Sequence, residues 1–103
     1  MKLRGKQKSF LRAQANQIKP VFSIGKNGLS DLWLNEVQEV INNRELIKVN
    51  IQQASDITVE EAKSFIEENS NIQVVQTIGR TLLLFVVSKK ENKRKISIDV
   101  AEI

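Results

Sequence analysis

Two glycines three residues apart enclose a lysine and an asparagine in the sequence Gly25-Lys26-Asn27-Gly28. Glycine permits positive φ and places no side chain between the backbone and a ligand, so a phosphate group can approach the main-chain N–H groups. Lys26 adds a full positive charge, and a helix start that follows adds a partial one. The spacing predicts a GxxG loop that holds the sugar–phosphate backbone of a nucleic acid.

The segments on either side of this loop predict a strand and a helix. Residues 21–24 form a short apolar run typical of a strand. Ser30 suits an N-cap, and Asp31 falls in the first turn, where an acid is favoured. Trp33 begins an apolar stripe at helical spacing that extends to about Arg44, so we expect it to be a core anchor and not a platform for stacked bases.

The first helix is predicted over residues 5–18, where Phe10 and Leu11 belong to a narrow apolar stripe. Lys8 and Arg12 lie four residues apart and therefore share one face of this helix. Lys6 and Lys19 lie nearby in the sequence, and the proline after Lys19 ends the helix. The helix is thus expected to carry a basic face.

The second half of the chain predicts a strand, a helix and a hairpin. Residues 46–51 alternate with period two, and Thr58 begins a capping box that starts a third helix. Residues 72–78 and 81–87 read as a hairpin whose turn has glycine at its first central position. Such a turn pairs Ile78 with Thr81 and Val74 with Phe85. Arg80, at the tip, is either a solvated turn residue or a phosphate contact.

The predicted order is α-β-α-β-α-β-β, an α/β fold with a mixed four-stranded sheet and helices packed on it. Residues 1–88 are expected to form one domain. Residues 89–103 form a basic C-terminal tail, which is either a flexible arm or a short added strand. We expect a monomer.

The charges are sorted along the chain. The net charge is +4, but residues 1–28 hold seven cations and no acid, and residues 29–88 hold four cations and nine acids. This segregation favours a polyanionic partner. The acidic second and third helices cannot form the basic face, so the first helix and the GxxG loop must supply it. They form one patch only if the helix packs beside the loop.

Composition argues against several classes of function. The 103 residues contain no cysteine and no histidine, which removes thiolate metal sites and the commonest general base. We therefore expect no catalytic residue, metal, cofactor or small-molecule substrate. No apolar run is long enough for a membrane helix and no signal peptide is visible, so a cytoplasmic protein is expected. Aromatic residues are few, which favours recognition of backbone and shape over base stacking.

Four blocks of the sequence together resemble the CRM domain (chloroplast RNA splicing and ribosome maturation), and above all its stand-alone bacterial YhbY-type form. These blocks are residues 3–12, 19–28, 44–49 and 78–85, in the correct order within a match over about 3–88. The resemblance departs from the family pattern at Arg80, where a small polar residue is expected, and it does not cover the segment after Lys89.

The resemblance implies a KH-like α/β fold similar to the C-terminal domain of translation initiation factor 3. It implies RNA binding through Gly25, Lys26, Asn27 and Gly28, with neighbouring basic residues. For the bacterial form it implies association with precursors of the large ribosomal subunit. On these grounds the chain is expected to be a noncatalytic RNA-binding protein of ribosome assembly, contacting ribosomal RNA through the residues Gly25, Lys26, Asn27, Gly28, Lys6, Lys8, Arg12, Lys19 and Arg80.

The alternative is a protein-docking adaptor. It would use the acidic faces of the second and third helices to bind a basic ribosomal protein or assembly factor.

Overall fold

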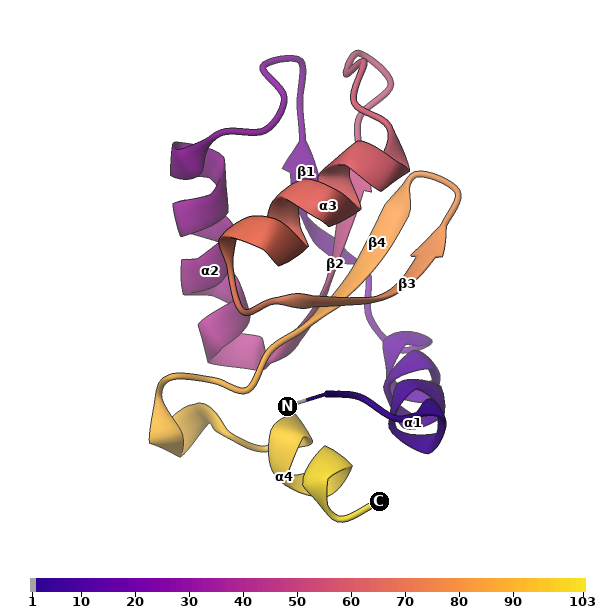
Figure 1. The fold of residues 1–103 in the computed structure, drawn as a ribbon, viewed down its shortest axis with the longest axis vertical. Helices are drawn as coiled ribbons and strands as arrows, with labels where there is room; N and C mark the ends of the chain where they lie inside the picture. The colour runs from indigo at the N-terminus through magenta and orange to yellow at the C-terminus, as the bar shows by residue number, and fades with distance from the viewer. Residues whose placement is uncertain (1) are drawn as a thin grey trace.

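A four-stranded sheet divides the molecule into two layers of helices (Figure 1). The computed structural model describes residues 2–103. The elements follow in the order α1 (Gly5–Ala15), β1 (Pro20–Ile24), α2 (Asp31–Arg44), β2 (Leu46–Ile51), α3 (Val59–Asn69), β3 (Gln73–Ile78) and β4 (Thr81–Phe85), then a short 3₁₀ turn η1 (Glu91–Lys93) and α4 (Ile96–Ala101). This confirms the predicted α/β class and order, with two further helical segments at the end.

The sheet is mixed, as predicted, with strand order β1-β2-β4-β3. β1 is parallel to β2, while β4 is antiparallel to both β2 and β3. Gly79 has φ +57° at the hairpin turn, and Ile78 pairs with Thr81, as expected. The expected pairing of Val74 with Phe85 is wrong, because an irregularity at Val75 shifts the register and pairs Val74 with Leu84.

The first hydrophobic core lies between one face of the sheet and the helices α2 and α3. Both helices start where side-chain caps predict, because Ser30 Oγ accepts from Trp33 N at 3.1 Å and Thr58 forms a reciprocal capping box with Glu61. The Trp33 side chain is buried and its Nε1 donates to Ser23 O at 2.9 Å. Trp33 is thus the core anchor that its spacing predicts.

The second core lies on the opposite face of the sheet, under α1 and α4. Leu11 of α1, Phe85 of β4 and Val100 of α4 are all fully buried there. The helix α1 ends at Ala15, three residues before the predicted end, and Ile18 packs against the second core from beyond it.

The C-terminal segment is neither a flexible arm nor an added strand. Its helix α4 contributes Val100 to the second core, and Val100 O accepts from Gln7 Nε2 of α1 at 3.0 Å. The carboxylate of Glu45, at the end of α2, accepts from the amides of Ser88, Lys95 and Ser97 at 2.8, 2.8 and 3.0 Å. These bonds hold the segment against the rest of the fold.

Within residues 2–103, no helix combines the length and the apolar character that crossing a membrane requires.

Candidate nucleic-acid interface

The GxxG loop joins β1 to α2, as the sequence predicts, and it lies at one end of the molecule (Figure 1). The amide of Gly28 donates to Gly25 O at 3.0 Å, which closes residues 25–28 into a turn. Gly28 has φ +70°, a conformation that side chains disfavour. Gly25 does not have a positive φ. The backbone conformation therefore favours glycine at position 28 but not at position 25.

A second segment, residues 52–57, packs against this loop and supports it. Gln52 N donates to Ile24 O at 2.9 Å, and Gln52 Nε2 donates to Ser23 Oγ at 3.1 Å. A Cβ on Gly25 would lie 3.2 Å from Gln52 Oε1, and one on Gly28 would lie 3.5 Å from the Ile57 side chain. The loop therefore lies directly against residues 52–57.

The prediction missed this supporting segment, although the sequence contains a signal for it. β1 and β2 are parallel neighbours, so the loops after both strands leave the sheet at the same edge. A parallel pairing of 21–24 with 46–51 would have placed Gln52 beside the GxxG loop.

The loop leaves the main-chain amides of two exposed residues for a ligand. The amide of Gly28 is already used within the turn. Among residues 2–103, the N–H groups of Lys26 and Asn27 take part in no hydrogen bond, and both residues are exposed. Two amides and the Lys26 ammonium are thus available together for a phosphate. Asp31, in the first turn of α2, opposes the anion-binding tendency of that helix start.

Arg80 has a structural role that the sequence did not reveal. Its guanidinium donates to the carbonyl oxygens of Gln52 at 3.0 Å and Ser55 at 2.9 Å, with a longer bond of 3.4 Å to that of Ile51. The side chain therefore fastens residues 51–55 to the hairpin. Arg80 is therefore not a freely solvated turn residue. Some of its N–H donors are used within the fold and are not open to a phosphate.

The helix α1 lies at the opposite end of the molecule from the GxxG loop (Figure 1). The molecule extends 40 Å along its longest axis, with the loop near one end and α1 near the other. Lys6, Lys8 and Arg12 are exposed on α1, and Lys19 is exposed between α1 and β1. The condition for a single compact patch, that α1 packs beside the loop, is not met.

The acids and the cations are unevenly divided among the elements of the fold. The helix α1 and all four strands contain no aspartate or glutamate, while they contain Lys6, Lys8, Arg12 and Lys48. The acids of residues 2–103 lie in α2, α3, the segments next to them and the C-terminal segment. On the side of the sheet that α1 covers in part, the cations lie on α1 and β2, and acids are contributed by the C-terminal segment.

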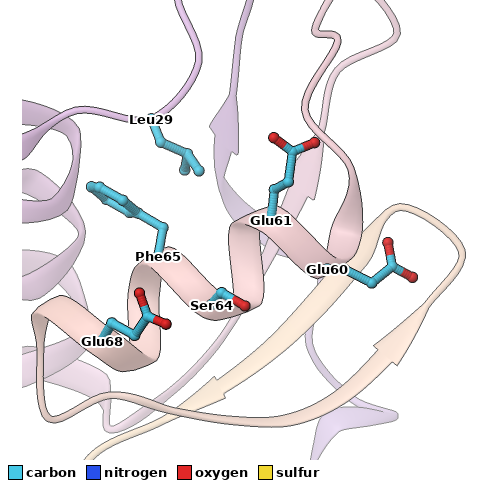
Figure 2. A pocket seen from close by; sticks show the side chains of 6 residues that line it. All are labelled: Leu29, Glu60, Glu61, Ser64, Phe65 and Glu68. Atoms are coloured by element: carbon cyan, nitrogen blue, oxygen red, sulfur yellow. The ribbon is translucent and has the colours of Figure 1, made fainter.

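The acidic side has a hollow of about 490 Å³ along α3. Figure 2 shows its lining, with Glu60, Glu61, Ser64, Phe65 and Glu68 on α3 and Leu29 reaching over from the loop. Leu29 follows Gly28 directly, so this hollow adjoins the GxxG loop. Its lining combines three glutamates with two apolar side chains, those of Leu29 and Phe65.

No group of three or more metal-ligating side chains comes together within residues 2–103. Burial, the largest influence on the pKa of Glu45, acts to raise it, but hydrogen bonds from Ser97, Ser88 and Lys95 outweigh burial and lower the pKa below 4.5. The buried carboxylate is thus held ionised by bonds that serve the fold.

Comparison with known proteins identifies close relatives. The family model of the CRS1 / YhbY (CRM) domain matches residues 3–85. The chain is 40% identical over 92 residues to the probable RNA-binding protein YqeI of Bacillus subtilis, a match covering 89% of this chain and 95% of the relative. It is 36% identical over 85 residues to an RNA-binding protein of Haemophilus influenzae, covering 82% and 86% of the two chains.

The solution structure of SAV1595 from Staphylococcus aureus is similar to this fold. It superposes with a TM-score of 0.72 at 33% identity and covers 91% of this chain and 98% of that chain.

Proposed function

Because this chain belongs to the CRS1 / YhbY (CRM) domain family, we propose that it is a noncatalytic RNA-binding protein. The observation that carries the proposal is the GxxG loop, with two unoccupied amides beside an exposed lysine. The helix α1 and the four strands of the sheet contain no aspartate or glutamate. The names of the bacterial relatives as RNA-binding proteins support the same function.

The mechanism is electrostatic and does not alter the RNA. The amides of Lys26 and Asn27 donate to one phosphate, and the Lys26 ammonium neutralises it. Lys6, Lys8, Arg12 and Lys19 contact other phosphates of the RNA, at a distance from the loop. Arg80 contributes by holding residues 51–55, which support the loop.

A salt titration of RNA affinity tests this mechanism. Each phosphate that a cation neutralises contributes a slope of about −0.7 in a plot of log affinity against log salt for single-stranded RNA. The Lys26→Gln variant should lose about one such increment, while Lys63→Gln, on the exposed acidic helix α3, should lose none. An RNA affinity that does not change with salt would contradict the mechanism.

We further propose that the RNA is ribosomal RNA in precursors of the large ribosomal subunit, bound by a cytoplasmic monomer. This finer proposal rests on the resemblance to the stand-alone bacterial form. Crosslinking in cells, with mapping of both the transcript and the linked residues, tests it directly. Crosslinks confined to transcripts other than ribosomal RNA would reject it and leave RNA binding intact.

A second candidate function is a protein-docking adaptor, favoured by the acidic hollow on α3 (Figure 2). A basic protein segment with an apolar side chain matches the glutamates of its lining and the apolar side chains of Leu29 and Phe65. Reversing the charges of Glu60, Glu61, Glu67 and Glu68 to lysine discriminates the two functions. If this variant loses association with pre-ribosomal particles while Lys26→Ala keeps it, the adaptor is the better account.

A further inference from the structure

The sheet face on the α1 side changes character along its length. Near α1 and α4 it is apolar, with Leu46, Leu83 and Phe85 buried in the second core. Toward the GxxG loop the same face carries polar side chains from β1, β2 and β4, beside the exposed Ile78 of β3. Lys48 pairs with Leu83, and Asn50 pairs with Thr81 on one side and Ser23 on the other, so these side chains point to the α1 side.

This polar half of the face is open. The helix α1 has only 11 residues and covers the apolar half. Four polar residues on this half of the face are half-buried: Lys48, Asn50, Thr81 and Ser23. Within residues 2–103, the side chains of Lys48 and Asn50 make no hydrogen bond or ion pair. They are left available for a ligand.

The charge on this face suits a polyanion. Lys48 lies at its middle, Lys26 is exposed beyond the strand ends at the loop, and Arg12 is exposed on α1 at the other end. The surrounding strands and α1 contain no carboxylate that would repel a phosphate. The face also presents no exposed aromatic ring, which favours contacts with phosphate and ribose over stacked bases.

We infer that a single RNA segment runs from the GxxG loop across the open sheet face to α1, with Lys48 and Asn50 as contacts at the middle of this path. The inference deepens the proposed RNA binding and rests on it. It also explains how two groups of cations at opposite ends of a 40 Å molecule serve one ligand, since the half-buried Lys48 and Asn50 lie on the sheet face between them.

The test measures the affinity and salt slope of the full-length protein for an oligouridine of about 12 nucleotides, which extends well beyond the roughly four that a GxxG loop clamps. The Lys48→Gln variant should lose about 0.7 units of slope, which corresponds to about fivefold weaker binding at 0.1 M salt. Lys48→Arg should retain both. Lys63→Gln, the same charge change on the acidic side, should bind like the unchanged protein.

The outcomes separate the inference from the proposed function. If Lys48→Gln binds like Lys63→Gln while Gly28→Asp weakens binding, the path across the sheet is wrong and the loop mechanism stands. If the unchanged protein does not bind, the proposed function itself fails. Circular dichroism checks the fold of each variant, and loss of binding in Lys48→Arg as well as in Lys48→Gln would indicate a packing effect and overturn the inference.

Discussion

Arg80 and Gln52 are joined by a hydrogen bond of 3.0 Å from the guanidinium to the main-chain carbonyl oxygen, across 28 residues of sequence. Gln52 in turn donates to Ile24 O and to Ser23 Oγ, directly before the GxxG loop. Arg80 therefore acts on the loop through Gln52. The hairpin, the segment 52–57 and the loop form one connected support.

The first prediction concerns Arg80→Lys. The substitution keeps the charge but cannot reproduce bonds to several carbonyl groups with one planar fork. We expect it to lower the free energy of unfolding by about 1–2 kcal/mol and to speed amide hydrogen exchange in residues 52–57. Arg80→Ala should behave similarly, and neither should change the salt slope of RNA binding. A slope reduced only in Arg80→Ala would instead identify Arg80 as a phosphate contact.

The second prediction tests the effect of a negative charge introduced at position 28. Gly28→Asp adds a carboxylate to the GxxG loop, and Gly28→Asn adds a neutral group of the same size at the same position. Both side chains tolerate φ +70° better than most, at a cost of about 1 kcal/mol. RNA affinity should fall much further in Gly28→Asp than in Gly28→Asn, as measured by fluorescence anisotropy. Equal affinities in two folded variants would remove the loop from the mechanism.

Local patterns were sufficient to predict most of the elements. The alternation in 46–51, the cap at Ser30 and the capping box at Thr58 are each encoded within a few residues, and each lies where it was expected. The irregularity at Val75 was not predictable in this way. The extra residue depends on the pairing of β3 with β4 and on the burial of Val75 in the second core, and no local pattern in 72–78 marks it.

The position of α1 on the sheet could not be predicted from sequence patterns. Its apolar stripe predicts that one side of the helix is buried. The stripe does not indicate which face or which end of the sheet buries it. Leu11 finds its partners in Phe85 and Val100, which lie far along the chain. Similarly, an arginine at a turn tip carries no sign that it bonds to main-chain carbonyl groups 25 to 29 residues earlier.

The third prediction treats the C-terminal segment as part of the domain. Val100 is fully buried against the second core, whereas Ile98, on the same short helix, is 53% exposed. Val100→Ala should lower the free energy of unfolding by about 1–2 kcal/mol through lost apolar burial. Ile98→Ala should change it by less than about 0.5 kcal/mol. Denaturant unfolding measures both, and equal small effects would mean that α4 is not packed in solution.

The fourth prediction follows from the ionised carboxylate of Glu45, which is fully buried. The folded state lowers the pKa of Glu45 below 4.5, so the unfolded chain binds its proton more readily. The stabilisation is therefore fully present above about pH 4.5 and is lost as the pH falls through the lower pKa of the folded state. Protonation would weaken the bonds to Ser88, Lys95 and Ser97, and so loosen the C-terminal segment.

The matched variants for this prediction are Glu45→Gln and Glu36→Gln, which remove one charge at a buried and at an exposed site of the same region. Glu45→Gln should be less stable at pH 7 by about 1–3 kcal/mol, because its amide N–H group faces main-chain donors. It should also lose less stability than the unchanged protein between pH 5 and pH 3, whereas Glu36→Gln should not show this flattening. Because hydrogen exchange reports each amide separately, faster exchange at Ser88 and Ser97 in Glu45→Gln would locate the loss at the C-terminal segment. Unaltered exchange there would refute the proposed anchor even if the overall stability fell.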